Sequence, residues 1–301
     1  ELLRAAQGTA TRDDDLGGGQ FGTVVLGDLA ALERAQARIG HGVHGGHGEA
    51  GDRGVAGHLH LAFAAAAEVG IDVAREGVEY SLANRVVAVG GQLISISGLN
   101  EPFDDIFLPL HGKHQASNAA AALIAVEAFF GEQDLDIDAV RAGFANVTSP
   151  GRCEIVHRDP TIILDAAHNP HGAKAIAETI QSEFTFDDVT GIVALMADKD
   201  ALGIFKALEP IMNQIIVTTN SAARSMAVGD LEALATQVFG ADRVFAQPTL
   251  ADAIDKAIKN SVRPLSDESL AILITGSVVT VGEARTAVRK RYAKDSIEDG
   301  K

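Results

Sequence analysis

The feature that most constrains the fold of this chain is a regular alternation of strand-like and helix-like segments after residue 160. Short runs rich in Val, Ile and Thr have the length and composition of buried strands. They occupy residues 161–165, 191–195, 214–219, 243–245 and 270–275. A chain that repeats a strand and then a helix builds a mostly parallel sheet with right-handed crossovers.

The segments between these strands place apolar residues on one helical face. The faces consist of Ala173, Ile176, Ala177, Ile180 and Phe184, of Leu231, Leu234, Ala235, Val238 and Phe239, and of Leu250, Ala253, Ile254, Ala257 and Ile258. Thr249 followed by Asp252 has the spacing of a capping box at the start of the third helix. We therefore predict an α/β fold with helices on both faces of the sheet.

The first 67 residues differ sharply in composition from the rest of the chain. They are rich in Gly and His and contain no Lys, Ser, Pro, Asn, Tyr, Cys or Met. A segment that lacks so many residue types does not resemble an ordinary globular segment, and its Gly/His-rich middle has no periodic pattern. We predict that residues 1–67 are disordered, are read from a shifted frame, or are joined from elsewhere.

From residue 68 onward the composition is that of an ordinary folded protein. Gly90 and Gly91 lie between two β-rich runs, which predicts a hairpin in which Ile94 and Ile96 face the core. Residues 115–130 are almost wholly apolar and Ala-rich, which indicates a buried helix. We predict one domain over residues 68–148 and a second over residues 149–301.

Charge and cysteine content exclude several classes of protein. A formal net charge of −16 argues against a nucleic-acid partner. No stretch reaches the roughly 18 uninterrupted apolar residues of a membrane span, and the first residues lack the pattern of a signal peptide. The single cysteine, Cys153, cannot form an internal disulfide. We expect a cytoplasmic protein that acts on small molecules.

Polar residues lie at the carboxyl end of the first predicted strand after residue 160. Asp165, His168 and Asn169 follow it, just before a predicted helix begins. Free backbone N–H groups at a helix N-terminus favour phosphate or carboxylate groups. Asp165 and Asn169 would also suit a purely structural role as caps of the turn and of the helix.

Two upstream segments carry further candidates. Arg152 follows a Pro–Gly turn, where its guanidinium could bind a phosphate through two hydrogen bonds. His114 and Asn118 are four residues apart and share one face at the start of the Ala-rich helix. Taken one at a time, an exposed arginine and a solvated helix start explain these residues equally well.

The order of these elements is more specific than any one of them. In chain order they are Gly112–Lys113–His114–Gln115 with Asn118–Ala119, Pro150–Gly151–Arg152–Cys153–Glu154, Leu164–Asp165–Ala166–Ala167–His168–Asn169–Pro170, Asp198–Lys199–Asp200, Thr219 with Arg224–Ser225, and Thr275–Gly276–Ser277 with Val281–Gly282–Glu283. This series resembles the folylpolyglutamate synthase and dihydrofolate synthase family of the Mur ligase superfamily. The resemblance covers residues 105–290, and Ala166 stands where the family usually has Gly.

The resemblance implies a fold and a reaction. Residues 149–301 would form a Mur-ligase-type C-terminal domain, and residues 68–148 would be the remnant of the central ATP-binding domain, an incomplete N-terminal ATPase-type domain. The reaction would use ATP and Mg²⁺ to phosphorylate the carboxylate of a folate or dihydropteroate. The amine of L-glutamate would then attack the acyl phosphate.

The resemblance also implies roles for individual residues. Arg152 would hold the nucleotide phosphates and stabilise transferred charge, and His168 would lie near the same phosphates. Asp165 would bind the ribose of ATP, and Asn118 would face the adenine. A last pair, Lys199 and Ser277, would contact the substrate at the domain edge.

One part of the family's machinery has no counterpart in this sequence. A phosphate-binding loop ends in Gly-Lys-Ser or Gly-Lys-Thr, whereas the first lysine here is Lys113 and His114 follows it. We find no recognisable ligands for Mg²⁺ and predict no metal site. An alternative reading is therefore a degenerate nucleotide-binding module without catalysis.

Two patterns in the N-terminal segment are weak signals. Residues 40–45 match G-x-G-x-x-G, but no strand precedes them, which disfavours both a dinucleotide site and an oxidoreductase reading. The histidines of this segment could chelate a transition metal, yet it contains no cysteine, so adventitious binding is the expected behaviour. These histidines are His41, His44, His47, His58 and His60.

Overall fold

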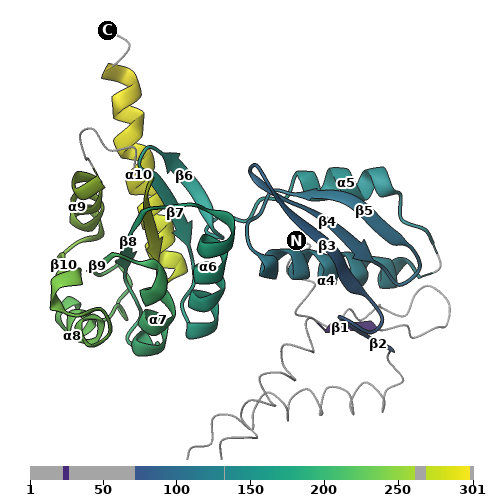
Figure 1. The fold of residues 1–301 in the computed structure, drawn as a ribbon, viewed down its shortest axis with the longest axis horizontal. Coiled ribbons are helices and arrows are strands. Elements are labelled where there is room, and N and C mark those ends of the chain that lie inside the picture. The colour runs from purple at the N-terminus through teal and green to yellow at the C-terminus, as the bar shows by residue number, and fades with distance from the viewer. Residues whose placement is uncertain (1–22, 27–71, 132, 262–268, 299–301) are drawn as a thin grey trace, which may run out of the picture. The chain divides into compact units, whose positions relative to one another are not determined.

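The computed structural model describes residues 23–26, 72–131, 133–261 and 269–298 (Figure 1). The chain divides into two compact units, which we describe separately. The first includes the chain up to Pro109 together with Lys113–Val147, and the second includes Leu110–Gly112 and the chain from Thr148 onward. The disorder or shifted frame expected for residues 1–67 lies outside the described residues, apart from residues 23–26.

The first unit contains two small sheets. β1 (Thr23–Leu26) pairs in parallel with β2 (Asp72–Arg75). The other sheet is an antiparallel meander of β3 (Ser81–Ala88), β4 (Gly91–Ser97) and β5 (Pro102–Leu108). The predicted hairpin is confirmed, although its register pairs Ala88 with Gly91, so that Val89 and Gly90 form the loop.

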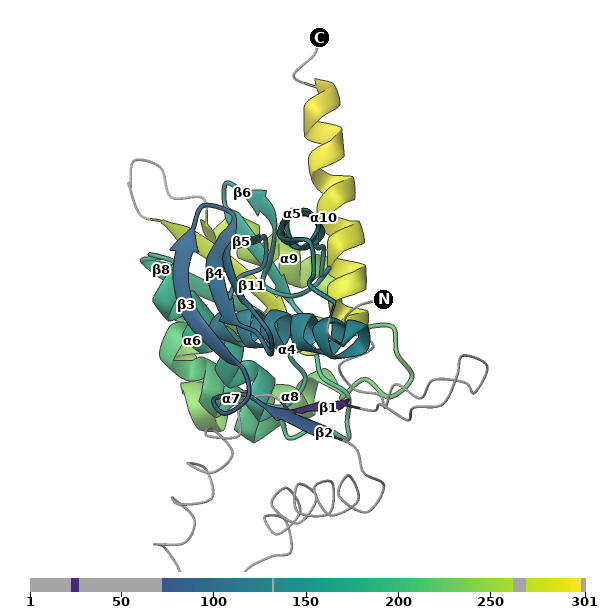
Figure 2. The same cartoon turned by 90° about the vertical axis from the view of Figure 1, so that its right-hand side faces the viewer.

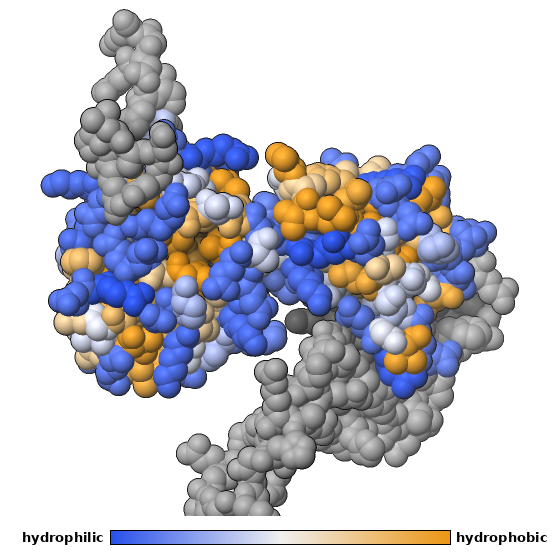
Figure 3. Space-filling view, in the orientation of Figure 1, coloured by the Kyte–Doolittle hydropathy of each residue, from blue (hydrophilic) through white to orange (hydrophobic). Residues whose placement is uncertain are grey.

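Two helices complete the first unit. α4 (Lys113–Phe130) contacts β1, β3 and β4, while α5 (Ile137–Ala145) contacts β5. Ile94 and Ile96 are fully buried, as the alternation predicted. Apolar side chains nevertheless remain on the surface of this unit (Figure 3). At the β3–β4 hairpin they are Val86, Val87, Val89 and Leu93.

The second unit is built on a six-stranded sheet with the order β10-β9-β8-β11-β7-β6. Its strands are β6 (Glu154–Arg158), β7 (Thr161–Asp165), β8 (Asp188–Val193), β9 (Gln214–Val217), β10 (Val244–Ala246) and β11 (Leu270–Thr275). All neighbours pair in parallel except β6, which runs antiparallel to β7 at one edge. The mostly parallel sheet is thus confirmed, and the antiparallel edge strand is an addition that the pattern did not reveal.

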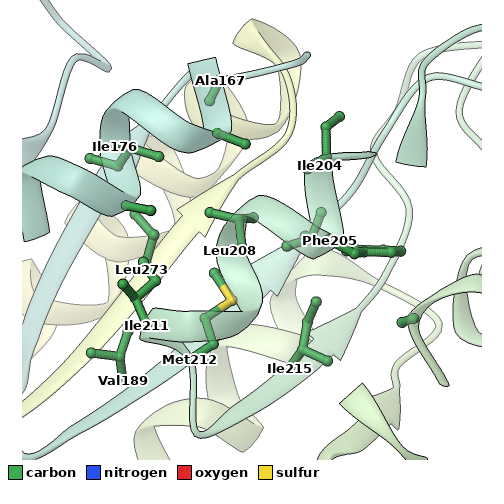
Figure 4. Packing of buried hydrophobic residues seen from close by; sticks show 14 of the residues in the cluster. Ala167, Ile176, Val189, Ile204, Phe205, Leu208, Ile211, Met212, Ile215 and Leu273 are labelled. Carbon is green, nitrogen blue, oxygen red and sulfur yellow. The ribbon is translucent and has the colours of Figure 1, made fainter. Parts of the chain in front are cut away.

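Helices cover both faces of this sheet, as predicted. One face packs on α6 (Pro170–Glu183), α7 (Ala201–Leu208) and α8 (Val228–Phe239), and Figure 4 shows part of that core around Phe205 and Leu208. The other face packs on α9 (Leu250–Ser261) and α10 (Val278–Glu298). Short 3₁₀ turns, Glu209–Ile211 and Ala241–Arg243, precede β9 and β10.

Several sequence predictions needed correction in detail. Strand β8 is Asp188–Val193 rather than the predicted residues 191–195. Ala194 and Leu195 are buried, but they follow Val193, the last residue of β8 that pairs with β11. Helix α7 was missed, since its eight residues are too short for a clear period. The capping box is confirmed, because the Thr249 hydroxyl accepts the Asp252 N–H at 3.1 Å.

The described helices also bear on the expectation about membranes. None of them combines the length and the apolar character needed to cross a bilayer.

Candidate functional site

In the second unit, the carboxyl ends of the parallel strands gather most of the predicted site residues. Asp165 ends β7, and Ser277 follows β11 after one glycine. Lys199 lies in the loop after β8. Because parallel strands end at a common edge, ligands of such sheets bind there. The site is therefore described from the residues of this edge.

Asp165 shapes the backbone on both sides of it. Its Oδ2 accepts the N–H of Cys153 and its Oδ1 accepts the N–H of Ala167, both at 2.9 Å. The side chain is buried, and burial raises the pKa of the Asp165 carboxyl, while the two N–H groups and the charge of Arg152 act in the opposite direction. The capping role considered from sequence is thus present in the structure.

Arg152 sits on the turn that Asp165 holds. The Arg152 N–H donates to the Ser149 carbonyl at 3.1 Å, and the Gly151 carbonyl accepts the Ala166 N–H at 2.8 Å. Gly151 has a φ of 76°, which an L side chain rarely adopts. The turn is therefore fixed to the end of β7, while the Arg152 side chain itself is exposed.

His168 and Asn169 occupy the start of α6. The Asn169 Oδ1 accepts the Gly172 N–H at 2.8 Å and caps the helix. The His168 Nδ1 lies 3.0 Å from the Ala166 carbonyl oxygen. A carbonyl oxygen only accepts, so Nδ1 carries the proton in this contact, and Nε2 of the exposed ring is left for a ligand.

Ser277 belongs to a buried polar network at the start of α10. Its hydroxyl lies 2.8 Å from the Thr280 hydroxyl and accepts the Thr280 N–H at 3.0 Å. The Asn220 amide donates to both hydroxyls, at 3.2 and 3.0 Å. Ser277 therefore caps α10 and ties it to the loop after β9, and its side chain has little exposed surface.

Lys199 is part of an ion cluster on the loops after β8 and β9. Its Nζ lies 3.0 Å from an oxygen of Asp198, and Arg224 approaches the other oxygen at 3.3 Å. The hydrogen bond from Lys199 is the main cause that lowers the pKa of the Asp198 carboxyl. Two cations thus share the Asp198 carboxylate.

The structure brings together some of the predicted residues and not others. Arg152, Asp165 and His168 surround the end of β7, and Lys199 and Ser277 follow strands of the same sheet. Asn118 belongs to the first unit, on α4, where its amide donates to Gln115 at 3.3 Å. Across the described ranges, no group of three His, Cys, Asp or Glu side chains could hold a metal ion. The histidines and the glycine pattern before residue 61 lie outside those ranges.

Comparison with known proteins finds a family match that includes this edge. The Mur ligase glutamate ligase domain matches residues 151–278, a span that holds Arg152, Asp165, His168, Lys199 and Ser277. Over these residues the second unit is similar to the Mur ligase glutamate ligase domain. Its sheet, with helices on both faces, agrees with solved folylpolyglutamate synthases.

Relatives extend the match beyond this domain. The dihydrofolate synthase/folylpolyglutamate synthase of Mycobacterium tuberculosis is 46% identical over 239 residues, which cover 76% of this chain and 49% of the relative. A probable bifunctional folylpolyglutamate synthase/dihydropteroate synthase of Halobacterium salinarum is 31% identical over 64% of this chain and 23% of its own length. Over the matched residues the chain is similar to folylpolyglutamate synthases and dihydrofolate synthases.

Solved structures agree with the sequence matches. The M. tuberculosis folylpolyglutamate synthase complexed with ADP has a TM-score of 0.73 and 47% identity, and the match covers 76% of this chain and 52% of that one. The Thermotoga maritima folylpolyglutamate synthase has a TM-score of 0.61 and 25% identity over 76% and 51%. The chain thus spans about half the length of the folylpolyglutamate synthases that it matches.

Some residues of the matched span were not assigned a role from sequence. Glu154 was quoted only as part of a motif, yet its carboxylate accepts the Gly151 N–H at 2.8 Å. Asn220 was not singled out, although it joins Ser277 to the loop after β9. Its place directly after a predicted strand was the available signal, because strand ends carry the site in such sheets.

Proposed function

We propose that this chain carries the glutamate-ligase half of an ATP-dependent ligase that adds L-glutamate to folates. In this reaction ATP phosphorylates a folate carboxylate, and the amine of glutamate displaces phosphate from the acyl phosphate. One observation carries the proposal: an exposed Arg152 on a turn fixed to the end of β7, inside the span matched by the glutamate ligase domain.

The chemistry of the edge supports a site for a nucleotide phosphate. A guanidinium forms paired hydrogen bonds with phosphate oxygens and stabilises charge that develops during phosphoryl transfer. His168 precedes α6, at a helix start where backbone N–H groups favour an anion. We assign Arg152 and His168 to the phosphates of ATP.

The remaining candidates receive narrower roles. Each Asp165 oxygen keeps one lone pair after its backbone contact, so the carboxylate can also accept a hydroxyl of the ribose. On the second unit, the Lys199 ammonium group and the start of α10 at Ser277 suit the carboxylates of glutamate.

The metal is treated differently from the nucleotide. A Mg²⁺ ion takes carboxylate and phosphate oxygens. The described residues hold no cluster of three such ligands, so we assign none of them to the metal. The substrates we propose are small molecules, namely ATP, L-glutamate and a folate or dihydropteroate. A net charge of −16 and a single cysteine fit a cytoplasmic location without a nucleic-acid partner.

The proposal is tested by following ADP release from ATP with the purified chain. We expect release that requires both L-glutamate and a folate or dihydropteroate acceptor. The Arg152→Ala variant should lose this release, whereas Arg158→Ala is a matched control, because Arg158 is exposed at the far end of β6. ADP release that does not require glutamate would contradict the proposal. So would an equal loss of ADP release in Arg152→Ala and Arg158→Ala.

A second candidate function is a nucleotide-binding module without catalysis. The observation that favours it is the absence of any Gly-Lys-Ser or Gly-Lys-Thr in the 301 residues, beside an intact Arg152 turn. Calorimetric titration with ADP separates the candidates, because a module binds ADP without supporting glutamate-dependent turnover. A folded chain that binds no ADP at millimolar concentration would remove both.

A further inference from the structure

The turn that carries Arg152 is attached to two different elements of the second unit. Towards the sheet, the Gly151 carbonyl and the Cys153 N–H bond to the end of β7, at 2.8 and 2.9 Å. On its other side the turn meets α10. This second attachment has no part in the proposed function as described so far.

Helix α10, drawn in yellow in Figure 2, contacts β6 and β7. A Cβ added to Gly151 would lie 2.8 Å from the Val281 side chain, so the turn packs directly on the helix. One helical turn later, the Arg285 guanidinium pairs with the Glu154 carboxylate. Val281 and Arg285 are four residues apart and share one face of α10, so both contacts come from the same face of the helix.

Glu154 connects the turn to α10. A single oxygen, Oε2, accepts the Gly151 N–H at 2.8 Å and also receives the Arg285 guanidinium. The side chains of Glu154 and Arg285 are 25% and 20% exposed, so water screens the pair less than it screens a surface ion pair. Charge-assisted hydrogen bonds of this kind are stronger than neutral ones.

We propose that Glu154, paired with Arg285, is a positioning residue for Arg152. It closes the turn through the Gly151 N–H, and α10 thereby sets the direction in which the Arg152 guanidinium leaves the carboxyl edge. Arg152 itself makes the contact with phosphate, and that part rests on the proposed function. Without the Glu154–Arg285 pair, the turn keeps its bonds to β7 but loses its bond to the helix.

A cysteine within the turn can report on whether the turn is open or closed. Cys153 lies between Arg152 and Glu154, is 2% exposed and is the only cysteine of the chain. Burial, and then the nearby charges of Asp165 and Glu183, raise the pKa of its thiol, so the closed turn disfavours the reactive thiolate. The rate at which a soluble disulfide reagent labels Cys153 therefore measures opening of the turn without any nucleotide.

The first arm of the experiment compares labelling rates of the full chain in dilute buffer. Glu154→Gln and Arg285→Gln should each label about tenfold faster than the parent, the effect of losing one charged hydrogen bond. Arg285→Lys keeps a cation in place and should restore most of the protection. Arg291→Gln is the matched control, because Arg291 lies on α10 like Arg285 but pairs with Asp255 of α9, so its loss should leave the rate unchanged.

The second arm measures ADP affinity by calorimetry for the same variants, alone and combined with Arg152→Met. If Glu154 acts through Arg152, Glu154→Gln should weaken ADP binding severalfold in the parent and have little further effect once Arg152 is replaced. A general loss of structure would instead weaken binding equally in both backgrounds. The urea midpoint of each variant checks that the second unit stays folded.

The outcomes distinguish the positioning role of Glu154 from the phosphate-binding role of Arg152. Faster labelling with rescue by Arg285→Lys, together with non-additive loss of ADP affinity, supports the proposal. Unchanged labelling in Glu154→Gln and Arg285→Gln overturns it, and so does an additive loss of affinity. If the parent binds no ADP, the phosphate role of Arg152 fails with the proposed function, and the labelling rates alone decide whether Glu154 and Arg285 hold the turn.

Discussion

The backbone N–H of Cys153 donates to the Asp165 carboxylate at 2.9 Å, so the last residue of β7 holds the turn that presents Arg152. The second Asp165 oxygen holds the segment that leads to His168, through the N–H of Ala167. One buried carboxylate thus shapes the backbone on both sides of the candidate phosphate site. Its side chain connects two segments that are separate in sequence.

Replacing Asp165 with Asn tests this role directly. An amide offers one oxygen, so one of the two backbone N–H groups would face an NH₂ group instead of an acceptor. We expect a loss of about 1–3 kcal/mol in the free energy of unfolding, measured with urea. Asp200→Asn is the control, because Asp200 caps α7 through the Gly203 N–H and Asn caps as well as Asp. Equal stability of the two variants would contradict the role.

The charge of Arg152 gives a pH-dependent prediction. Burial raises the pKa of Asp165, and the Arg152 guanidinium opposes that rise, so Arg152→Ala should raise the pKa further. A raised carboxyl pKa means that folding favours the protonated form. Stability then falls as the pH rises from the unfolded pKa, about 3.9, through the folded pKa.

The variant should therefore match the parent below pH ~3.9 and become progressively less stable above it. Urea unfolding of both proteins across this range measures the difference. A deficit that is the same at every pH would show that Arg152 does not interact with the ionised Asp165.

Gly276, between β11 and α10, has a φ of 117°, and a Cβ there would lie 2.4 Å from the Ala194 carbonyl oxygen. Gly276→Ala should therefore lower the free energy of unfolding by roughly 1–3 kcal/mol through backbone strain and displacement of Ala194. Gly282→Ala is the control, since a Cβ on that helical glycine meets no atom within 4 Å. It should be neutral or stabilising by up to about 1 kcal/mol. Similar thermal midpoints for the two variants would argue against the close approach.

Glu127 gives a prediction for the first unit. Its buried carboxylate on α4 accepts the N–H groups of Leu99 and Asn100, at 2.8 and 2.7 Å, and fixes the turn between β4 and β5. Glu127→Gln should leave one of these donors unsatisfied and speed amide exchange at both residues by about tenfold or more. Cys153 labelling in the second unit should not change. Unaltered exchange would mean that the turn is held by other contacts.

Much of the second unit could be predicted from sequence because its strands are short apolar runs separated by amphipathic helices. β7 and β11 have the predicted bounds, and the apolar faces of α6, α8 and α9 are the ones that pack on the sheet. β6 escaped prediction because an edge strand that is half-exposed on both sides has no clear apolar alternation. The short α7 escaped for lack of a second period.

The site was only partly predictable, for a physical reason. The motifs pointed to Arg152, Asp165 and His168 as candidates, and all three lie at or beside the carboxyl end of β7, while their roles stay predictions. The partners that hold them come from distant sequence positions, as Arg285 does for Glu154 and Asn220 for Ser277. Tertiary packing creates these contacts, and no local pattern encodes them.

The most direct test of the central claim is ADP formation by the purified chain with ATP, L-glutamate and a folate acceptor, compared with reactions that omit each substrate in turn. Our account predicts ADP only when all three are present, and its loss in Arg152→Ala. A folded chain that binds ADP but forms none under these conditions would contradict the ligase proposal and favour the nucleotide-binding module.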